Sequence, residues 1–414
     1  MKLSELYNQR KSFYWDMPST ARGGLIFLVL AGVLTFIAGM VVGEETRTWG
    51  SLLFNLMFFF SIALGGVAFG NMQDLIGASW GRPIKRIHES FVAFLPVAVV
   101  LFIAFFACIK LDLFQAGKVY KWIADPQMIA AYHGKNVWLQ ADFMIVRDVI
   151  ALLVILTLAR WHWKKTTAAD TVVLSGELEK AAIVGEQSRK ALRHWSAPVL
   201  VAYAFLYSLL SFDLVMSLSP TWFSTLWGGL SFSIMMQTLF ALTMILMFAF
   251  KGGPLGQFIQ RQQFHDIGKL LFGFTAFYAY LAYSHVLTYW YTNIPEETSF
   301  FLTRMEQPWL KLLVAAPFVS FLVPFSLLVA KPAKWTAYLT IPVCCLVLAA
   351  QWVNYLLFVI PELADAATWI FPWIEFGVML GFVGVFFLMF ARSSRKVPLL
   401  CIGDPLLLTA LSKH

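Results

Sequence analysis

Charged residues are scarce in this chain of 414 residues. Asp, Glu, Lys and Arg make up only 13% of it, whereas 59% is hydrophobic and the mean hydropathy is +0.72. Soluble globular proteins carry roughly 25% charged residues, so most of this chain requires a solvent other than water. We therefore exclude soluble enzymes, nucleic-acid-binding proteins and secreted scaffolds, and expect an all-α integral membrane protein embedded in lipid.

Cysteine is also scarce, and its spacing excludes several cofactors. The chain has four cysteines, of which Cys344 and Cys345 are adjacent, and it has no C-x-x-C or C-x-x-C-H motif. Covalent c-type haem, iron–sulfur clusters and structural zinc therefore lack their ligands. A membrane haem b needs two facing histidines at depth, but only His285 of the seven histidines lies clearly within an apolar run. We expect this chain to bind no metal or cofactor by itself.

Ten apolar runs are long enough to cross a membrane as helices. They span residues 24–42, 51–70, 90–109, 142–159, 197–217, 224–250, 269–290, 309–330, 336–360 and 368–391. We expect one polytopic membrane domain over residues 1–414, with segments 1–23 and 392–414 in the cytoplasm and a ten-helix region at 24–391. The polar stretch 161–195 is predicted to hold one amphipathic surface helix at 175–193.

The distribution of basic residues predicts the orientation. Of 31 Lys and Arg, 23 lie in the terminal segments and the even-numbered loops, and only 6 lie in the loops of the opposite side. Because basic loops stay in the cytoplasm, we expect both termini on the cytoplasmic side of a bacterial inner membrane. The net charge of +8 is then an orientation signal and not a nucleic-acid-binding site.

Ionisable side chains at membrane depth are costly and therefore functional candidates. The outer half of the predicted bundle holds Asp142, Arg147, Asp148, Asp213, His285 and Glu375, the inner half holds Asp74, His88 and Glu89, and Tyr203, Tyr207 and Gln237 lie between them. One interpretation is a proton path made of two half-channels, and the other is polar contacts that hold the helices together.

Helical geometry restricts how these groups pair. Arg147 and Asp148 are neighbours in sequence, so their side chains point about 100° apart and each needs a partner on another helix. On the seventh run, Tyr278, His285 and Tyr289 recur at helical spacing and share one face. We expect Arg147 to hold Asp148 or Asp213 ionised.

Two loops of the outer side are rich in Pro, Trp and acidic residues but poor in basic ones. They are 217–224 (SLSPTWFS) and 289–301 (YWYTNIPEETSFF). We predict that they dock partner subunits through Trp222, Asn293, Pro295, Glu296 and Glu297. The alternative is simple anchoring of aromatic rings at the level of the lipid headgroups.

Four stretches resemble one family, the NrfD or polysulfide-reductase C-like membrane subunits. GRPIKRIHESFVAFLP (81–96) resembles the family's Arg-Arg-Ile-x-Glu entry to the third helix. HGKNVWLQADFMIVRDVI (133–150) is similar to its Lys-x-x-Tyr-Leu segment, with Trp138 replacing the tyrosine. SFDLVMSLSPTWFSTLWGG (211–229) resembles its Asp-x-x-Met-Ser-x-x-Pro-x-Trp motif, and YWYTNIPEETSFF resembles its Trp-Tyr-x-Asn-x-Pro-Glu-Glu-Thr signature. The resemblance covers roughly residues 20–390.

This resemblance implies an architecture and a setting. The family's fold implies two four-helix bundles, formed by helices 2–5 and 6–9 and flanked by helices 1 and 10. The match points to alternative complex III, a quinol:cytochrome c oxidoreductase of respiratory or photosynthetic electron transport. A homologous membrane subunit would bind the quinol or menaquinol there, while other subunits would carry the iron–sulfur clusters and c-type haems. This chain would be structural and could conduct protons, and the resemblance carries no quinol site to particular residues.

Two alternatives remain open. Within the same fold, the chain could be the quinone-binding membrane anchor of a polysulfide- or nitrite-reductase-type enzyme. From another class, it could be a secondary transporter, although no pair of Gly- or Pro-broken helices occupies matching positions in two halves. A transporter would purify alone, whereas an oxidoreductase subunit would purify with haem- and cluster-bearing partners.

Overall fold

The computed structural model describes residues 3–130, 134–253, 255–364, 369 and 371–412. The chain is 84% helical, and the described residues contain no strand. Nine segments of this described part are long and apolar enough to cross a membrane by length and composition. The expectation of an all-α protein with many apolar helices is therefore confirmed.

Each predicted apolar run coincides with a long helix. These helices are α2 (Ser19–Val41), α3 (Glu45–Ile76), α5 (Leu95–Lys110), α9 (Ala141–Leu174), α10 (Leu178–Leu214), α11 (Trp227–Lys251), α12 (Arg261–Thr292), α14 (Trp309–Leu328), α15 (Ala337–Val359) and α16 (Trp373–Lys396). The start of the tenth run, residue 368, lies outside the described residues. Only α9 is missing from the nine candidate spans, because Arg147, Asp148 and Arg160 interrupt its apolar stretch.

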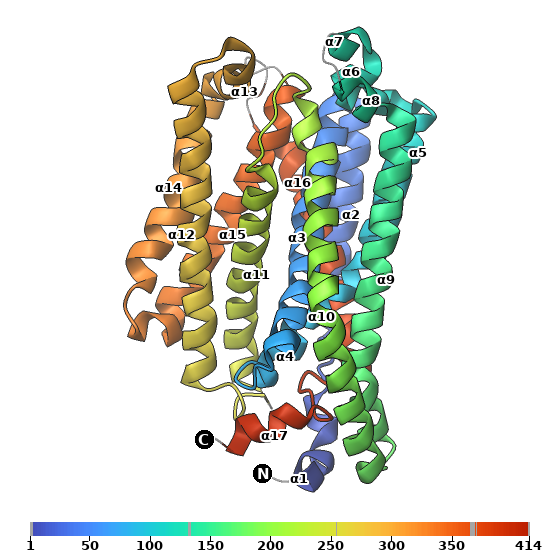
Figure 1. The fold of residues 1–414 in the computed structure, drawn as a ribbon, viewed down its shortest axis with the longest axis vertical. Helices are drawn as coiled ribbons and strands as arrows, with labels where there is room; N and C mark the ends of the chain where they lie inside the picture. Colours follow the sequence, from blue (N-terminus) through green and yellow to red (C-terminus); the bar gives the residue numbers. More distant parts are fainter. Residues whose placement is uncertain (1–2, 131–133, 254, 365–368, 370, 413–414) are drawn as a thin grey trace.

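Short helical segments precede, connect and follow these long helices. They are α1 (Leu3–Asn8), η1 (Arg10–Phe13), η2 (Arg82–Ile84), α4 (Lys85–Glu89), η3 (Ser90–Phe94), η4 (Leu113–Val119), α6 (Lys121–Ala124), α7 (Gln127–Ala130), α8 (Lys135–Trp138), η5 (Met216–Leu218), α13 (Pro295–Met305), η6 (Pro332–Trp335), η7 (Ile360–Glu362) and α17 (Pro405–Ser412). Figure 1 shows both termini at one end of the molecule, together with α1, α4 and α17. We call this the inner end, and the end that carries α6, α7, α8 and α13 the outer end.

Helix α3 lies at the centre of the molecule. The most apolar part of α3 is 94% buried, and the helix packs against α5, α10, α11, α15 and α16. Helix α2, by contrast, is only 11% buried in its most apolar part and packs mainly on α16. The α2–α16 contact is close, because a Cβ added at Gly32 would lie 2.4 Å from the Cα of Gly381.

The polar stretch 161–195 differs from its prediction. It forms no separate surface helix but a helical hairpin, in which α9 runs to Leu174 and α10 begins at Leu178. Gly176 makes the turn with a φ of +90°, a conformation that suits glycine. The amphipathic stretch has no break before the next apolar run, so it continues into α10, and Figure 1 shows both helices extending to the inner end.

Candidate functional site

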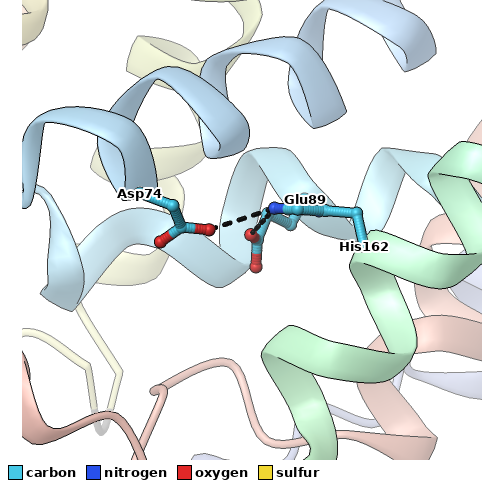
Figure 2. Close-up of side chains that lie close together, drawn as sticks. All are labelled: Asp74, Glu89 and His162. Carbon is cyan, nitrogen blue, oxygen red and sulfur yellow. Dashed lines mark hydrogen bonds and ion pairs between the residues drawn. The ribbon is translucent and has the colours of Figure 1, made fainter. Parts of the chain in front are cut away.

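A buried cluster of charged side chains lies at the inner end. Figure 2 shows its centre, where Asp74 of α3, Glu89 of α4 and His162 of α9 point toward one another. The Nε2 atom of His162 lies 3.1 Å from Oδ2 of Asp74 and 3.7 Å from Oε1 of Glu89. All three side chains are at least nine-tenths buried, so helices far apart in sequence meet here through ionisable groups.

Three cations surround these carboxylates. Oδ1 of Asp74 accepts hydrogen bonds from Nη1 of Arg82 and Nζ of Lys85, both at 2.6 Å. Arg86 donates to Oε2 of Glu89 at 2.6 Å. Each of these cations is almost completely buried, and a buried charge is tolerable only when it is paired and hydrogen-bonded.

Residues of the C-terminal segment just before α17 complete the cluster. Asp170 of α9 accepts a hydrogen bond from Nη2 of Arg86 at 2.6 Å and another from the backbone N–H of Gly403 at 2.7 Å. Asp404 lies 3.0 Å from Nη1 of Arg82. Burial raises the pKa of Asp170, although Arg86 and the N–H of Gly403 oppose this shift. The segment before α17 therefore closes the inner end of the cluster.

Glycines allow these helices to approach one another. A Cβ at Gly66 of α3 would lie 2.2 Å from the carbonyl oxygen of His88, and one at Gly70 would lie 2.8 Å from Oε1 of Glu89. The two glycines are one helical turn apart and face α4. Their lack of side chains brings Glu89 close enough to α3 to share the cluster with Asp74.

The ligand set of the cluster would suit a transition metal, but its surroundings do not. One histidine and two carboxylates offer atoms within 4.8 Å of one another, and such groups bind zinc or iron. Here each carboxylate already accepts a hydrogen bond from a cation at 2.6 Å, and three cations would repel a metal ion. The four carboxylates of Asp74, Glu89, Asp170 and Asp404 face three cations, and His162 lies between Asp74 and Glu89. We interpret the cluster as an ion-pair network.

The sequence identified only part of this network. Asp74 and Glu89 join it as predicted, whereas His88 does not and instead places Nδ1 3.0 Å from the carbonyl oxygen of Gly66. The other ring nitrogen of His88 has no hydrogen-bond partner among the described residues. His162 and Asp170 were missed because they lie beyond the end of an apolar run. Their spacing of eight residues, about two helical turns, was the available signal.

The outer half of α9 and α10 carries a second, partly buried ion pair. Nε of Arg147 donates to Oδ2 of Asp213 at 2.7 Å, and Nε1 of Trp138 donates to Oδ1 of Asp213 at 2.9 Å. The guanidinium also lies 3.9 Å from the centroid of the Trp138 ring. The expected partner of Arg147 on another helix is therefore Asp213, and Trp138 completes the site.

Asp148 lies beside this pair, close to the carboxylate of Asp213. It is completely buried, and neither of its carboxyl oxygens has a hydrogen-bond partner among the described residues. Asp213 is close enough for the two carboxylates to repel each other, and the one guanidinium already binds Asp213. A buried carboxylate next to a second one is unfavourable as an anion, so Asp148 is a candidate for carrying a proton or binding internal water.

The other outer residues do not join this pair, which corrects the expectation of a single outer cluster. Asp142 is exposed and pairs with Lys110 at the surface. Glu375 forms a two-point ion pair with Arg47, with atom separations of 2.8 and 2.9 Å. Asp142 is on α9 but on its exposed face, and Glu375 is on α16, which packs mainly on α2, α3 and η3.

His285 belongs neither to the inner ion-pair network nor to the Arg147–Asp213 pair. Its Nδ1 donates to the carbonyl oxygen of Leu281 at 2.9 Å, and its Nε2 lies 2.7 Å from the hydroxyl of Ser224. Tyr278, His285 and Tyr289 are all buried on the same face of α12, as their spacing predicted.

Polar side chains continue through the middle of the molecule. Tyr207 hydrogen-bonds the hydroxyl of Tyr355 at 3.0 Å, while the buried hydroxyl of Tyr203 has no partner among the described residues. Gln237 belongs to another network, in which it donates to Thr275 at 2.9 Å and accepts from Gln351. Tyr207 and Gln237 thus belong to two separate networks, and Tyr203 joins neither of them among the described residues.

A large apolar cavity opens between α11, α12, α13, α14 and α15. Its volume is about 810 Å³, and its wall includes His285, Tyr278, Asn354 and Arg304 among many aromatic side chains. The polar atoms of this wall are mostly engaged, since Asn354 donates to Tyr278 and Arg304 pairs with Glu362. The cavity therefore suits an apolar ligand with few polar atoms.

The predicted docking residues have different environments. Trp222 is a correction, because it is buried and its ring stacks on Phe300 at 4.0 Å. Asn293 and Pro295 are exposed at the turn between α12 and α13, Glu297 is partly exposed, and the side chain of Glu296 lies outside the described residues. Trp290 and Tyr291, at 74% and 84% exposure, are surface residues that the prediction did not name.

The inner ion-pair network and the Arg147–Asp213 pair are both built on α9. They lie at opposite ends of the region where α3, α9 and α10 pack together. Neither a model of a known protein family nor a curated protein matches this chain.

Proposed function

We propose that this chain is a membrane subunit of a multisubunit quinol oxidoreductase and that it conducts protons. The resemblance of its motifs suggests a subunit of the ActF type from alternative complex III. Sister subunits would then supply the quinol site, the iron–sulfur clusters and the c-type haems. The packing of α3, α5, α9 and α10 together, and of α11, α12, α14 and α15 together, supports the two-bundle arrangement of that family.

One observation carries the proton-conducting role. A column of polar side chains on α10 lies between the inner ion-pair network and the Arg147–Asp213 pair. Ser196 donates to Asn71 at 3.2 Å, and Asn71 lies one turn from Asp74 on α3. Tyr203 and Tyr207 follow on the same face of α10. Tyr203 lies about 10 Å along the helix axis from Ser196, and Tyr207 lies about 6 Å beyond Tyr203. Asp213 is about 9 Å beyond Tyr207.

Unsatisfied polar atoms mark where water would complete this route. The hydroxyl of Tyr203, the carboxyl of Asp148 and Nε2 of His88 all lack a described partner, and buried polar groups in that state are usually hydrated. Such water molecules would bridge neighbouring polar side chains that are too far apart for direct hydrogen bonds. Protons would enter at the inner network and leave past Asp148.

The test uses the complete complex reconstituted in vesicles, with quinol oxidation and proton movement measured together. Asp148→Asn keeps the shape but removes the titrating group, and we expect proton movement per quinol to fall by about tenfold or more. Asp142→Asn, on the same helix but exposed, is the matched control. Unchanged proton movement in Asp148→Asn would make these carboxylates structural. Purification of the chain without any cofactor-bearing partner would overturn the oxidoreductase assignment.

A second candidate function is quinone binding by this chain itself. The cavity of about 810 Å³ favours it, because an isoprenoid quinone is apolar with few polar atoms and His285 lies on the wall. Photolabelling with an azidoquinone would distinguish the two functions. Label on α12 that an excess of quinol removes would support binding, and label confined to a sister subunit would exclude it.

A further inference from the structure

A basic pocket lies at the inner end between the first and last long helices. Arg22 of α2 and Arg392, Arg395 and Lys396 of α16 line it, and its volume is about 650 Å³. The three residues of α16 lie at spacings of three and four, so they share one face of the helix. This pocket is separate from the ion-pair network described above, and the proton path does not use it.

The charges of the pocket are only partly neutralised within the chain. Asp16 pairs with Arg22 at 3.0 Å and with Arg395 at 3.3 Å. Among the described residues, Arg392 and Lys396 have no carboxylate within ion-pair distance, and both are exposed. Four cations against one anion leave a surplus of positive charge that favours an anionic ligand.

Apolar side chains form the other wall of the same pocket. Ile26, Leu388 and Met389 lie about one turn from the cations, toward the middle of the membrane, and Ala391 adjoins Arg392. Ile26 is 47% exposed, and α2 is the helix with only 11% of its most apolar part buried. The pocket therefore opens toward lipid, and a ligand can place a charged group on the cations and hydrocarbon against the wall.

We propose that this pocket binds the headgroup of an anionic phospholipid. Guanidinium groups bind phosphate oxygens through paired hydrogen bonds, and basic pockets between membrane helices bind such headgroups on the cytoplasmic side. A free phosphate ion would use the same cations, but it would leave the apolar wall uncovered. The lipid would hold α2, the N-terminal segment and α16 together where the two helices leave the membrane.

Native mass spectrometry of the full-length chain, purified together with any partner subunits that it retains, tests this proposal directly. Phosphatidylglycerol is titrated against the protein in detergent, with phosphatidylcholine as the zwitterionic lipid and sodium phosphate as the free ion. The variant Arg392→Gln/Lys396→Gln removes the two unpaired cations, while Lys164→Gln/Lys165→Gln removes two exposed cations of α9 at the same end. Each cation near a lipid surface strengthens the binding of anionic lipid. Loss of two cations should therefore weaken the binding of phosphatidylglycerol by the pocket variant roughly thirty-fold.

The outcomes separate the lipid from its alternatives. We expect tight binding of phosphatidylglycerol by the parent chain and the control variant, weaker binding of phosphatidylcholine, and recovery with Arg392→Lys. Equal binding of phosphatidylglycerol by the pocket variant and the control would overturn the proposal. Sodium phosphate that binds as tightly as the lipid, or that displaces the lipid, would also overturn the proposal. An unaltered melting temperature of the pocket variant without lipid shows that the change acts on binding and not on folding.

Discussion

The ion pair between Arg47 and Glu375 should act as a structural link between α3 and α16. Nε and Nη2 of Arg47 contact the two oxygens of Glu375 at 2.8 and 2.9 Å, and Nε1 of Trp369 donates to Oε1 at 3.1 Å. The side chains are 7% and 0% exposed. Removal of one partner leaves a buried charge uncompensated, which costs about 3–5 kcal/mol. We expect that loss in unfolding free energy for either Arg47→Met or Glu375→Leu.

The double variant Arg47→Met/Glu375→Leu decides whether the pair is structural. Because it removes both charges and leaves apolar groups of similar volume, it should be far more stable than the sum of the single changes predicts. Equilibrium unfolding in detergent, followed by tryptophan fluorescence, measures all four proteins. Additive losses would show that the two side chains do not depend on each other, and the geometric argument would then fail. Altered proton movement in a fully stable double variant would instead return Glu375 to the proton path.

Two further predictions concern close backbone contacts. Gly66→Ala should destabilise the protein by about 1–3 kcal/mol through overpacking, because its Cβ would lie 2.2 Å from a backbone oxygen of α4. Gly23→Ala, with nothing within 4 Å, should be neutral or stabilising, and equal melting temperatures of the two variants would contradict the prediction. Gly403→Ala should displace the C-terminal segment and expose Cys401, whose thiol has a pKa raised by burial. Labelling of Cys401 with a water-soluble maleimide should then accelerate, and an unchanged rate would mean that the segment tolerates the extra methyl group.

Much of the fold could be predicted from local sequence, because the length of an apolar run is a local property. A run of about 20 residues must satisfy its own backbone hydrogen bonds within lipid and therefore becomes a helix. The helical face shared by Tyr278, His285 and Tyr289 was readable for the same reason, since it depends only on spacing. The need of Arg147 for a partner on another helix also followed from the geometry of adjacent residues.

The partners themselves depended on helix packing, which no local pattern encodes. Glu375 meets Arg47 across 328 positions, and His162 meets Asp74 across 88. Helix α3 is apolar and buried on nearly all sides, so its sequence shows no single face for its neighbours. Hydropathy assigns each residue a depth in the membrane but not a direction around the helix axis. The sequence alone therefore determined which segments form long apolar helices and which side chains needed partners. The tertiary structure decided which charges meet, because close packing at glycines sets the rotation and neighbours of each helix.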